Sequence, residues 1–132
     1  MKTEPNIDFD TMIARADDAV TTLSPAEVEA RAEEKGVLLV DIRDIRELQR
    51  EGRIPGARHV PRGMLEFWIH PESPYFKDYF DAADEVILHC NRGWRSALAA
   101  KALKDIGLEV AHMSGGYTQW VEEGRATESL DK

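Results

Sequence analysis

The sequence predicts a single α/β domain, with a central, mostly parallel sheet and helices on both faces. Two short apolar runs, residues 37–40 and 86–88, are each followed at once by polar residues, as expected of parallel strands buried on both faces. Segments with helical spacing lie between the strand candidates, so strands and helices alternate. The length of 132 residues fits one domain.

The N-terminal third begins with a predicted helix over residues 9–20, where apolar side chains recur at steps of three and four. A short strand candidate follows at 21–23. Ser24 can cap the next helix, with Pro25 at its first position and Glu27 completing a capping box, and Gly36 is the expected stop.

In the middle of the chain, the strand at 37–40 leads into a short helix at 45–50, which Gly52 closes. A turn at 54–57 precedes a short strand near 59–60. A helical stretch is expected from Pro61 to Trp68 and a loop at 71–74. A further short helix is expected to dock through four aromatic residues, Tyr75, Phe76, Tyr79 and Phe80.

The last third contains the strand at 86–88, a polar loop at 89–95 and a helix that Ser96 opens and Gly107 ends. A strand at 108–112, a sharp turn at Gly115 and Gly116 and a helix at 117–123 complete the chain. We expect residues 1–20 to form an N-terminal helical extension, 21–126 the domain, and 127–132 a short tail.

Composition excludes several classes of function. A single cysteine rules out an internal disulfide and any multi-cysteine zinc site. The net charge of −8 argues against nucleic acid and anionic membranes as partners. No apolar run approaches the roughly 18 residues of a membrane span, and the N-terminus does not resemble a signal peptide, so a cytoplasmic location is expected. The spacing of His59, His70 and His112 fits no metal site.

The lone cysteine, Cys90, lies where the chemistry of this fold is expected. Ligands of parallel α/β sheets bind at the carboxyl ends of the strands, where loops lead into helix N-termini. Arg92 and Arg95 flank the thiol, and Gly93 lets the loop turn several N–H groups toward one point. Cations and helix N-termini favour the thiolate, so we expect a nucleophile inside an anion-binding loop rather than an inert core cysteine.

Four motifs, in this order, resemble the single-domain rhodaneses, a family of sulfurtransferases. The resemblance covers residues 23–124, and each motif is weak alone but specific in combination. The motifs are Leu39-Val40-Asp41-Ile42-Arg43, then Gly52-Arg53-Ile54-Pro55-Gly56-Ala57, then Cys90-Asn91-Arg92-Gly93-Trp94-Arg95-Ser96, and finally Ser114-Gly115-Gly116 with Trp120.

The resemblance implies a rhodanese-like α/β fold in three layers, with a central, mostly parallel five-stranded sheet. It also implies the transfer of a sulfane sulfur from thiosulfate, or a similar small anionic donor, through a Cys90 persulfide. The acceptor would be cyanide, a thiol or an acceptor protein, and no cofactor or metal is implied. The loop Asn91, Arg92, Gly93, Trp94, Arg95 and Ser96 would hold the anion. Asp41 and Arg43 match the family's Asp-x-Arg and are expected to support the loop through a buried ion pair. Trp94 is expected at the mouth, and Gly115, Gly116 and Trp120 as a turn and a core anchor.

Two other readings compete with this one. Cysteine phosphatases and related arsenate reductases contain a His-Cys-x5-Arg loop, and His89 and Cys90 match its beginning. In this chain, however, Ser96 occupies the position of the arginine, and Arg95 comes one position early. The shorter loop is better suited to one sulfur atom than to phosphate. The other alternative is a non-catalytic rhodanese-like module that binds proteins. Such modules often lack the cysteine that this chain retains.

Overall fold

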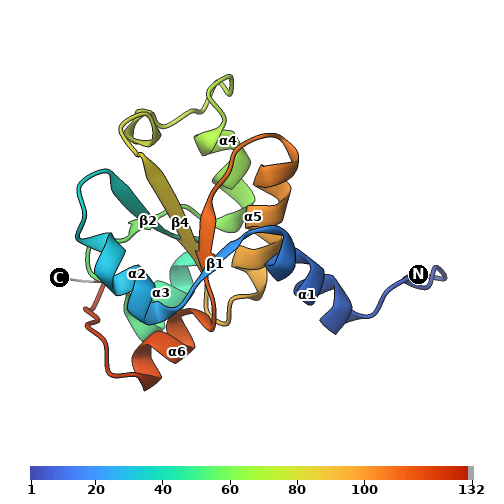
Figure 1. Cartoon of the computed structure of the whole chain (residues 1–132), viewed down its shortest axis with the longest axis horizontal. Coiled ribbons are helices and arrows are strands. Elements are labelled where there is room, and N and C mark those ends of the chain that lie inside the picture. The colour runs from blue at the N-terminus through green and yellow to red at the C-terminus, as the bar shows by residue number, and fades with distance from the viewer. Residues whose placement is uncertain (131–132) are drawn as a thin grey trace.

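The computed structural model describes residues 1–130 and contains one five-stranded sheet in which every neighbouring pair is parallel. The strand order is β1-β5-β4-β2-β3, so β4 lies at the centre. This arrangement confirms the predicted fold class (Figure 1). The strands are β1 (Thr21–Leu23), β2 (Val37–Asp41), β3 (Arg58–His59), β4 (Glu85–His89) and β5 (Ala111–Met113).

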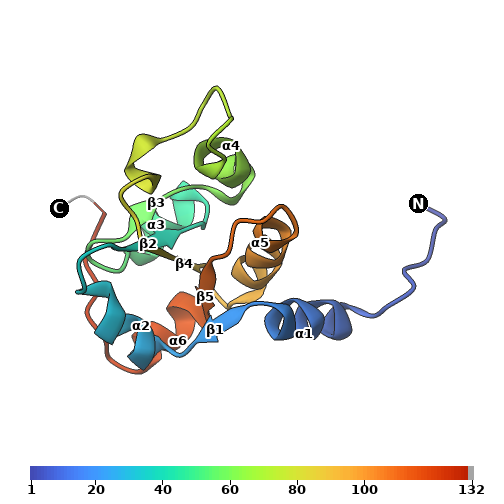
Figure 2. The same ribbon diagram turned by 45° about the horizontal axis from the view of Figure 1, so that its top comes forward.

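Helices alternate with the strands and form two outer layers (Figure 2). The helices α2 and α6 pack on one face of the sheet, and α4 and α5 pack on the other. Short 3-10 turns occur at Arg62–Met64 and Asp78–Phe80. The helices are α1 (Phe9–Ala19), α2 (Pro25–Ala32), α3 (Ile45–Glu51), α4 (Leu65–Ile69), α5 (Trp94–Asp105) and α6 (Gly116–Glu122).

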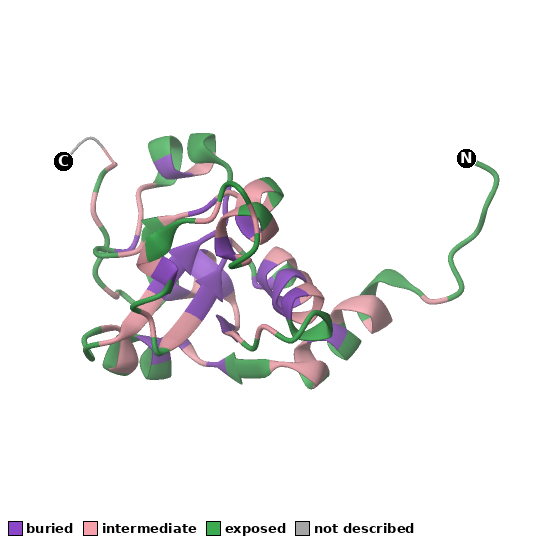
Figure 3. Cartoon of the chain, turned by 90° about the horizontal axis from the view of Figure 1, so that it is seen from above, coloured by how far each residue is buried: buried purple, intermediate pink, exposed green. Residues whose placement is uncertain are grey.

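The alternation of side chains along the central strands divides the core into two clusters, one on each face of the sheet. In β4, Leu88 joins the cluster under α4 and α5, whereas Ile87 joins the cluster under α2 and α6. Both side chains are fully buried. Figure 3 shows the buried residues concentrated in the central strands and in the facing side of α5. The continuous apolar runs are therefore explained by burial on both faces.

Helix caps follow the local sequence closely. Ser24 caps α2 with Pro25 in the first turn, and Glu27 completes the predicted capping box. Asp44 and Glu47 form a second capping box on α3, which ends at Gly52. These caps fix where the chain enters the two helices, and the second also fixes the backbone of Glu47.

Three predicted elements differ from the structure. The last strand is Ala111–Met113 rather than 108–112, because the pairing with β4 and β1 begins at Ala111. The helix after Cys90 begins at Trp94 instead of Ser96. The aromatic segment forms only the 3-10 turn Asp78–Phe80, and Tyr75 is 63% exposed, so its side chain does not dock.

Helix α1 and the segment around Glu128 both contact the domain, whereas the chain before α1 projects away from it (Figure 1). Helix α1 packs along α5 and leads directly into β1. Near the C-terminus, the backbone of Glu128 pairs with that of Arg53 in an antiparallel bridge. Of the predicted tail at 127–132, residues 131 and 132 lie outside the described residues. Within residues 1–130 no helix is both long and apolar enough to cross a bilayer.

Candidate active site

Cys90 directly follows β4, at the carboxyl end of the central strand, and its side chain is buried. The chain turns around the sulfur, so that the backbone N–H of Gly93 donates to Sγ at 3.1 Å and that of Ser96 at 3.4 Å. Gly93 has a φ of +89°, a left-handed backbone conformation that is strained for any residue with a side chain. The predicted convergence of loop amides on the thiol is therefore present.

The left-handed Gly93 also explains why α5 starts earlier than predicted. It occupies the N-cap position, and no side chain caps the helix. Cys90 Sγ instead accepts the hydrogen bond from Ser96 N–H in the first turn. The sulfur thus lies at the positive end of α5, where a negative charge is stabilised.

The first turn of α6 holds the loop from the other side. The N–H of Tyr117 donates to the Cys90 carbonyl at 2.8 Å, and the N–H of Thr118 donates to the Asn91 carbonyl at 2.9 Å. Gly116 makes this approach possible, because a Cβ atom there would lie 2.5 Å from the Asn91 carbonyl carbon. The predicted turn at Gly115 and Gly116 is thus also a contact surface for the active-site loop.

Asp41 and Arg43 form the predicted buried ion pair at the end of β2. Arg43 Nη2 donates to Asp41 Oδ2 at 2.8 Å and to the Gly52 carbonyl at 2.8 Å. The guanidinium stacks on the ring of Tyr117 at 4.1 Å, and Tyr117 is the residue whose amide holds the Cys90 carbonyl. The pair therefore supports the loop through α6 and does not touch the sulfur.

His89, next to the cysteine, is fully buried, with Nε2 3.6 Å from Asp41 Oδ2. Burial lowers the pKa of His89, although Asp41 opposes that shift. Burial by itself raises the pKa of Asp41, but His89 and Arg43 bring it below its ordinary value. His89 is therefore part of the buried support of the loop and does not contact the sulfur.

The two loop arginines, both expected to hold the anion, differ in their contacts. Arg95 donates to both carboxylate oxygens of Glu47, at 2.6 and 3.0 Å. This hydrogen bond holds the pKa of Glu47 below its usual range. Arg92 is exposed and forms no ion pair within residues 1–130. Among residues 1–130, Arg92 is therefore the loop arginine without an ion pair, and no local sequence pattern indicates the contact between Arg95 and Glu47.

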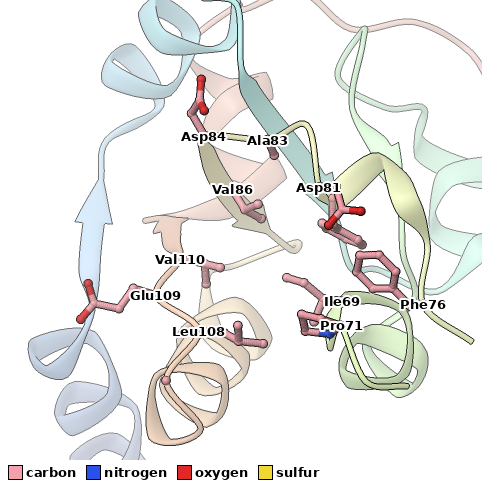
Figure 4. Close-up of a pocket in the computed structure, with 12 residues that line it drawn as sticks. Ile69, Pro71, Phe76, Asp81, Ala83, Asp84, Val86, Leu108, Glu109 and Val110 are labelled. Atoms are coloured by element: carbon pink, nitrogen blue, oxygen red, sulfur yellow. The ribbon is translucent and has the colours of Figure 1, made fainter. Parts of the chain in front are cut away.

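An open cavity of about 610 Å³ lies beside the loop, lined by Arg92 and Trp94 together with residues of α6 and its N-cap. Trp94 is half-exposed, as expected of a residue at the mouth, and its ring meets that of Phe9 edge to face at 5.3 Å. A second cavity, of about 240 Å³, lies at the opposite end of the sheet near Val86 and Val110 (Figure 4). It shares no residue with the loop.

The comparison with protein families agrees with this geometry. A model described as the rhodanese-like domain matches residues 24–123. The chain belongs to the rhodanese-like domain family. The match includes the Cys90 loop, which lies at the carboxyl end of β4 as the sequence motifs predict.

Known proteins similar to this rhodanese-like domain include a mouse protein called thiosulfate sulfurtransferase/rhodanese-like domain-containing protein 3. It is 26% identical over 101 residues, which cover 72% of this chain and 64% of the mouse protein, so the match spans less than two thirds of that relative.

Two solved structures extend the comparison. A Rhodopseudomonas palustris protein of unknown function, described as a possible tyrosine phosphatase, is 41% identical with a TM-score of 0.87, and the match covers 97% of this chain and 99% of that one. The polysulfide-sulfur transferase of Wolinella succinogenes is 27% identical with a TM-score of 0.68, covering 92% and 87% of the two chains. Both structures share the fold of this chain.

Proposed function

We propose that this protein is a sulfurtransferase that carries a sulfane sulfur on Cys90 as a persulfide. The arrangement around the sulfur carries the proposal: Sγ at the end of β4 receives N–H groups from Gly93 and Ser96 at 3.1 and 3.4 Å. The same donors that favour a thiolate stabilise a persulfide anion, much as an oxyanion hole stabilises negative oxygen. Membership of the rhodanese-like family supports this reading.

In the first half-reaction, the Cys90 thiolate attacks the outer sulfur of thiosulfate. A bond forms between the two sulfur atoms, the S–S bond of thiosulfate breaks, and sulfite leaves with the electron pair of that bond. Arg92 is placed to attract the anionic donor because its guanidinium is exposed beside the loop. The product is the Cys90 persulfide anion, held under the loop amides.

In the second half-reaction, a nucleophile attacks the terminal sulfur of the persulfide. Cyanide yields thiocyanate, and a thiolate yields a new persulfide. In both cases Cys90 leaves as the thiolate, so the enzyme returns to its starting state without an external electron donor. The cavity beside Arg92 and Trp94 is the proposed entry for a small thiol or for a segment of an acceptor protein. A cytoplasmic setting, where a lone thiol stays reduced, fits this cycle.

The experiment is an assay of thiocyanate formation from thiosulfate and cyanide. We expect turnover by the wild-type protein and none after Cys90→Ser, because serine does not form a persulfide. Turnover that persists in the folded Cys90→Ser variant, or its absence from the wild type with several sulfane donors, would overturn the assignment.

Phosphate-ester hydrolysis is the second candidate, since the 41% identical Rhodopseudomonas palustris protein is described as a possible tyrosine phosphatase. The ion pair between Arg95 and Glu47 counts against it, because the arginine that a phosphatase loop needs for phosphate is already bound to a carboxylate. Release of nitrophenol from p-nitrophenyl phosphate tests this candidate. Binding of a protein partner with neither activity would instead favour the non-catalytic module.

A further inference from the structure

A buried chain of hydrogen bonds runs from Cys90 to helix α1. Cys90 Sγ lies 3.5 Å from Ser96 Oγ, which lies 2.9 Å from His112 Nδ1. His112 Nε2 in turn lies 2.7 Å from Asp17 Oδ1. Ser96 and His112 are at most 1% exposed, whereas the Asp17 side chain is 41% exposed. The chain therefore connects the buried sulfur with a carboxylate in contact with solvent.

The hydrogen atoms in this chain have two consistent arrangements. When Cys90 is a thiol, its S–H donates to Ser96 Oγ, the hydroxyl donates to Nδ1 of a neutral His112, and Nε2–H donates to Asp17. When Cys90 is a thiolate, it only accepts, so the Ser96 hydroxyl donates to sulfur and must itself accept from Nδ1–H. His112 then carries protons on both nitrogens.

From this inventory we propose that His112, oriented by Asp17, takes the proton of Cys90 through the Ser96 hydroxyl. One proton passes from Sγ to Oγ while the hydroxyl proton passes from Oγ to Nδ1, so the proton count is unchanged. The result is a thiolate and an imidazolium, the latter facing the Asp17 carboxylate. Ser96 touches the reacting sulfur, and His112 and Asp17 are positioning residues. The proposal deepens the proposed function, which requires the thiolate.

The surroundings of His112 suit this role. Asp17 of α1 is the charged group that faces the ring, Ser96 faces it from α5, and its strand partners are the uncharged Thr22 of β1 and Leu88 of β4. Burial lowers the pKa of His112, and Asp17 opposes that shift. The short contact between Nε2 and the Asp17 carboxylate is therefore what favours the imidazolium.

The position of Asp17 supplies a second, independent observation. It lies in the last turn of α1, where the helix dipole disfavours a carboxylate. No basic residue occupies that turn. The contact with His112 stabilises the Asp17 carboxylate against the helix dipole, and it does so most strongly when the imidazole ring carries a positive charge. Helix α1 would then be part of the active site, in addition to covering α5.

The test uses Asp17→Asn and measures thiolate formation directly, from the ultraviolet absorbance of the thiolate against pH, after subtraction of the Cys90→Ser trace. We expect the midpoint to move to higher pH by about one unit, which is about tenfold less thiolate below the midpoint. A purely electrostatic role predicts the opposite sign, because removing a negative charge favours the thiolate. Asp18→Asn, the same change at an exposed position of the same helix, is the matched control.

A second variant, His112→Gln, retains a hydrogen-bonding side chain but accepts no proton, and it is expected to move the midpoint in the same direction. The ring ¹⁵N shifts of His112 should report an imidazolium whenever Cys90 is a thiolate, up to the pH at which the imidazolium itself loses its proton. An unchanged or lowered midpoint in both variants, or a neutral ring beside the thiolate, would overturn the proposal. No sulfur donor is used, so this result and the outcome of the thiocyanate assay are independent.

Discussion

Glu47 limits the positive charge available at the active-site loop. Its carboxylate binds Arg95 through both oxygens, while Arg92 on the same loop stays exposed. Under the proposed function, an anionic donor would meet one guanidinium without an ion pair among residues 1–130, that of Arg92. Glu47 also accepts from the Asp44 backbone in the capping box of α3, so its position is fixed by its own helix.

Glu47→Gln should strengthen donor binding. Glutamine preserves the capping box but removes the charge that holds Arg95, so Arg95 becomes available to thiosulfate. Partly exposed ion pairs contribute up to about 1 kcal/mol, so the KM for thiosulfate should fall about two- to fivefold with kcat nearly unchanged. Initial-rate kinetics against thiosulfate concentration measure this.

Glu66→Gln provides the control for that measurement. It removes the same charge from a partly exposed ion pair with Arg62, which within residues 1–130 shares no ion pair with the loop. Its KM for thiosulfate should equal that of the wild type. An equal KM for Glu47→Gln would mean that Arg95 takes no part in donor binding even when it is free.

At the residue scale, the sequence predicts the side chains that belong to short local motifs. Gly93, the loop arginines and the Asp41–Arg43 pair follow from local motifs, and all lie near Cys90 or support its loop. Glu47 and His112 do not, since a single carboxylate or histidine at a distant position carries no local pattern. Asp17 and His112 are 95 positions apart and meet only after the sheet has formed.

At the element scale, the site depends on how β4 passes into α5. Cys90 directly follows the strand and Gly93 is the N-cap of the helix, so very few residues connect the two elements. A backbone change at Gly93 therefore cannot be absorbed by its neighbours in the loop. The N-terminus of α6 fills the remaining space, since a Cβ at Gly93 would already lie 3.2 Å from the Gly115 nitrogen. Loop geometry is thus set by three elements together.

Gly93→Ala should damage the site more than it damages the fold. An alanine at a φ of +89° is strained by about 1–3 kcal/mol, and relief of that strain rotates the Gly93 N–H away from Sγ. We expect kcat/KM for sulfur transfer to fall at least about tenfold, in line with loss of one donor from an anion-stabilising site.

Gly56→Ala provides the comparison. Gly56 has a similar φ of +82°, and nothing lies within 4 Å of a Cβ built there. Urea unfolding should show a comparable loss of stability in both variants. If Gly56→Ala lowers activity as much as Gly93→Ala does, strain alone explains the effect and the loop hydrogen bond is unimportant.

Element boundaries were predicted less well than elements. The apolar stretch at 108–112 suggested a strand, but only Ala111–Met113 pairs with its neighbours. Leu108 and Val110 precede the strand and are partly buried against the core without joining the sheet. Hydrophobic residues indicate that a segment is buried. The length of a strand depends instead on which backbone groups pair with a neighbouring strand, and this pairing cannot be predicted from the local sequence.

At the scale of the whole molecule, the alternation of strands and helices was enough to predict a parallel sheet with helices on both faces. Buried apolar runs, capping boxes and glycine stops all point to the same architecture, and the structure confirms it. The placement of α1 against α5 was not specified, because its amphipathic face is compatible with several partners.

Stability should decrease as the pH falls below neutrality. Burial lowers the pKa of both His89 and His112 below the ordinary value of 6.5. Below that value the unfolded chain takes up protons that the folded protein does not, so their contribution is complete above pH 6.5 and decreases as the pH falls. Asp41, whose pKa is lowered despite its burial, adds a loss of the same sign below pH 3.8.

Urea unfolding at about pH 7.5 and about pH 5 measures this dependence, and the midpoint should be lower at the acidic pH. A urea midpoint that is the same or higher at the acidic pH would show that protonation of the two buried histidines does not destabilise the folded protein.

The most direct test of the central claim is the intact mass of the protein after incubation with thiosulfate and removal of excess donor. The wild-type chain should gain one sulfur atom and lose it again on addition of cyanide, whereas Cys90→Ser should gain none. A wild-type protein that is folded yet gains no mass from thiosulfate or other sulfane donors, or a Cys90→Ser variant that gains the same mass, would contradict the account.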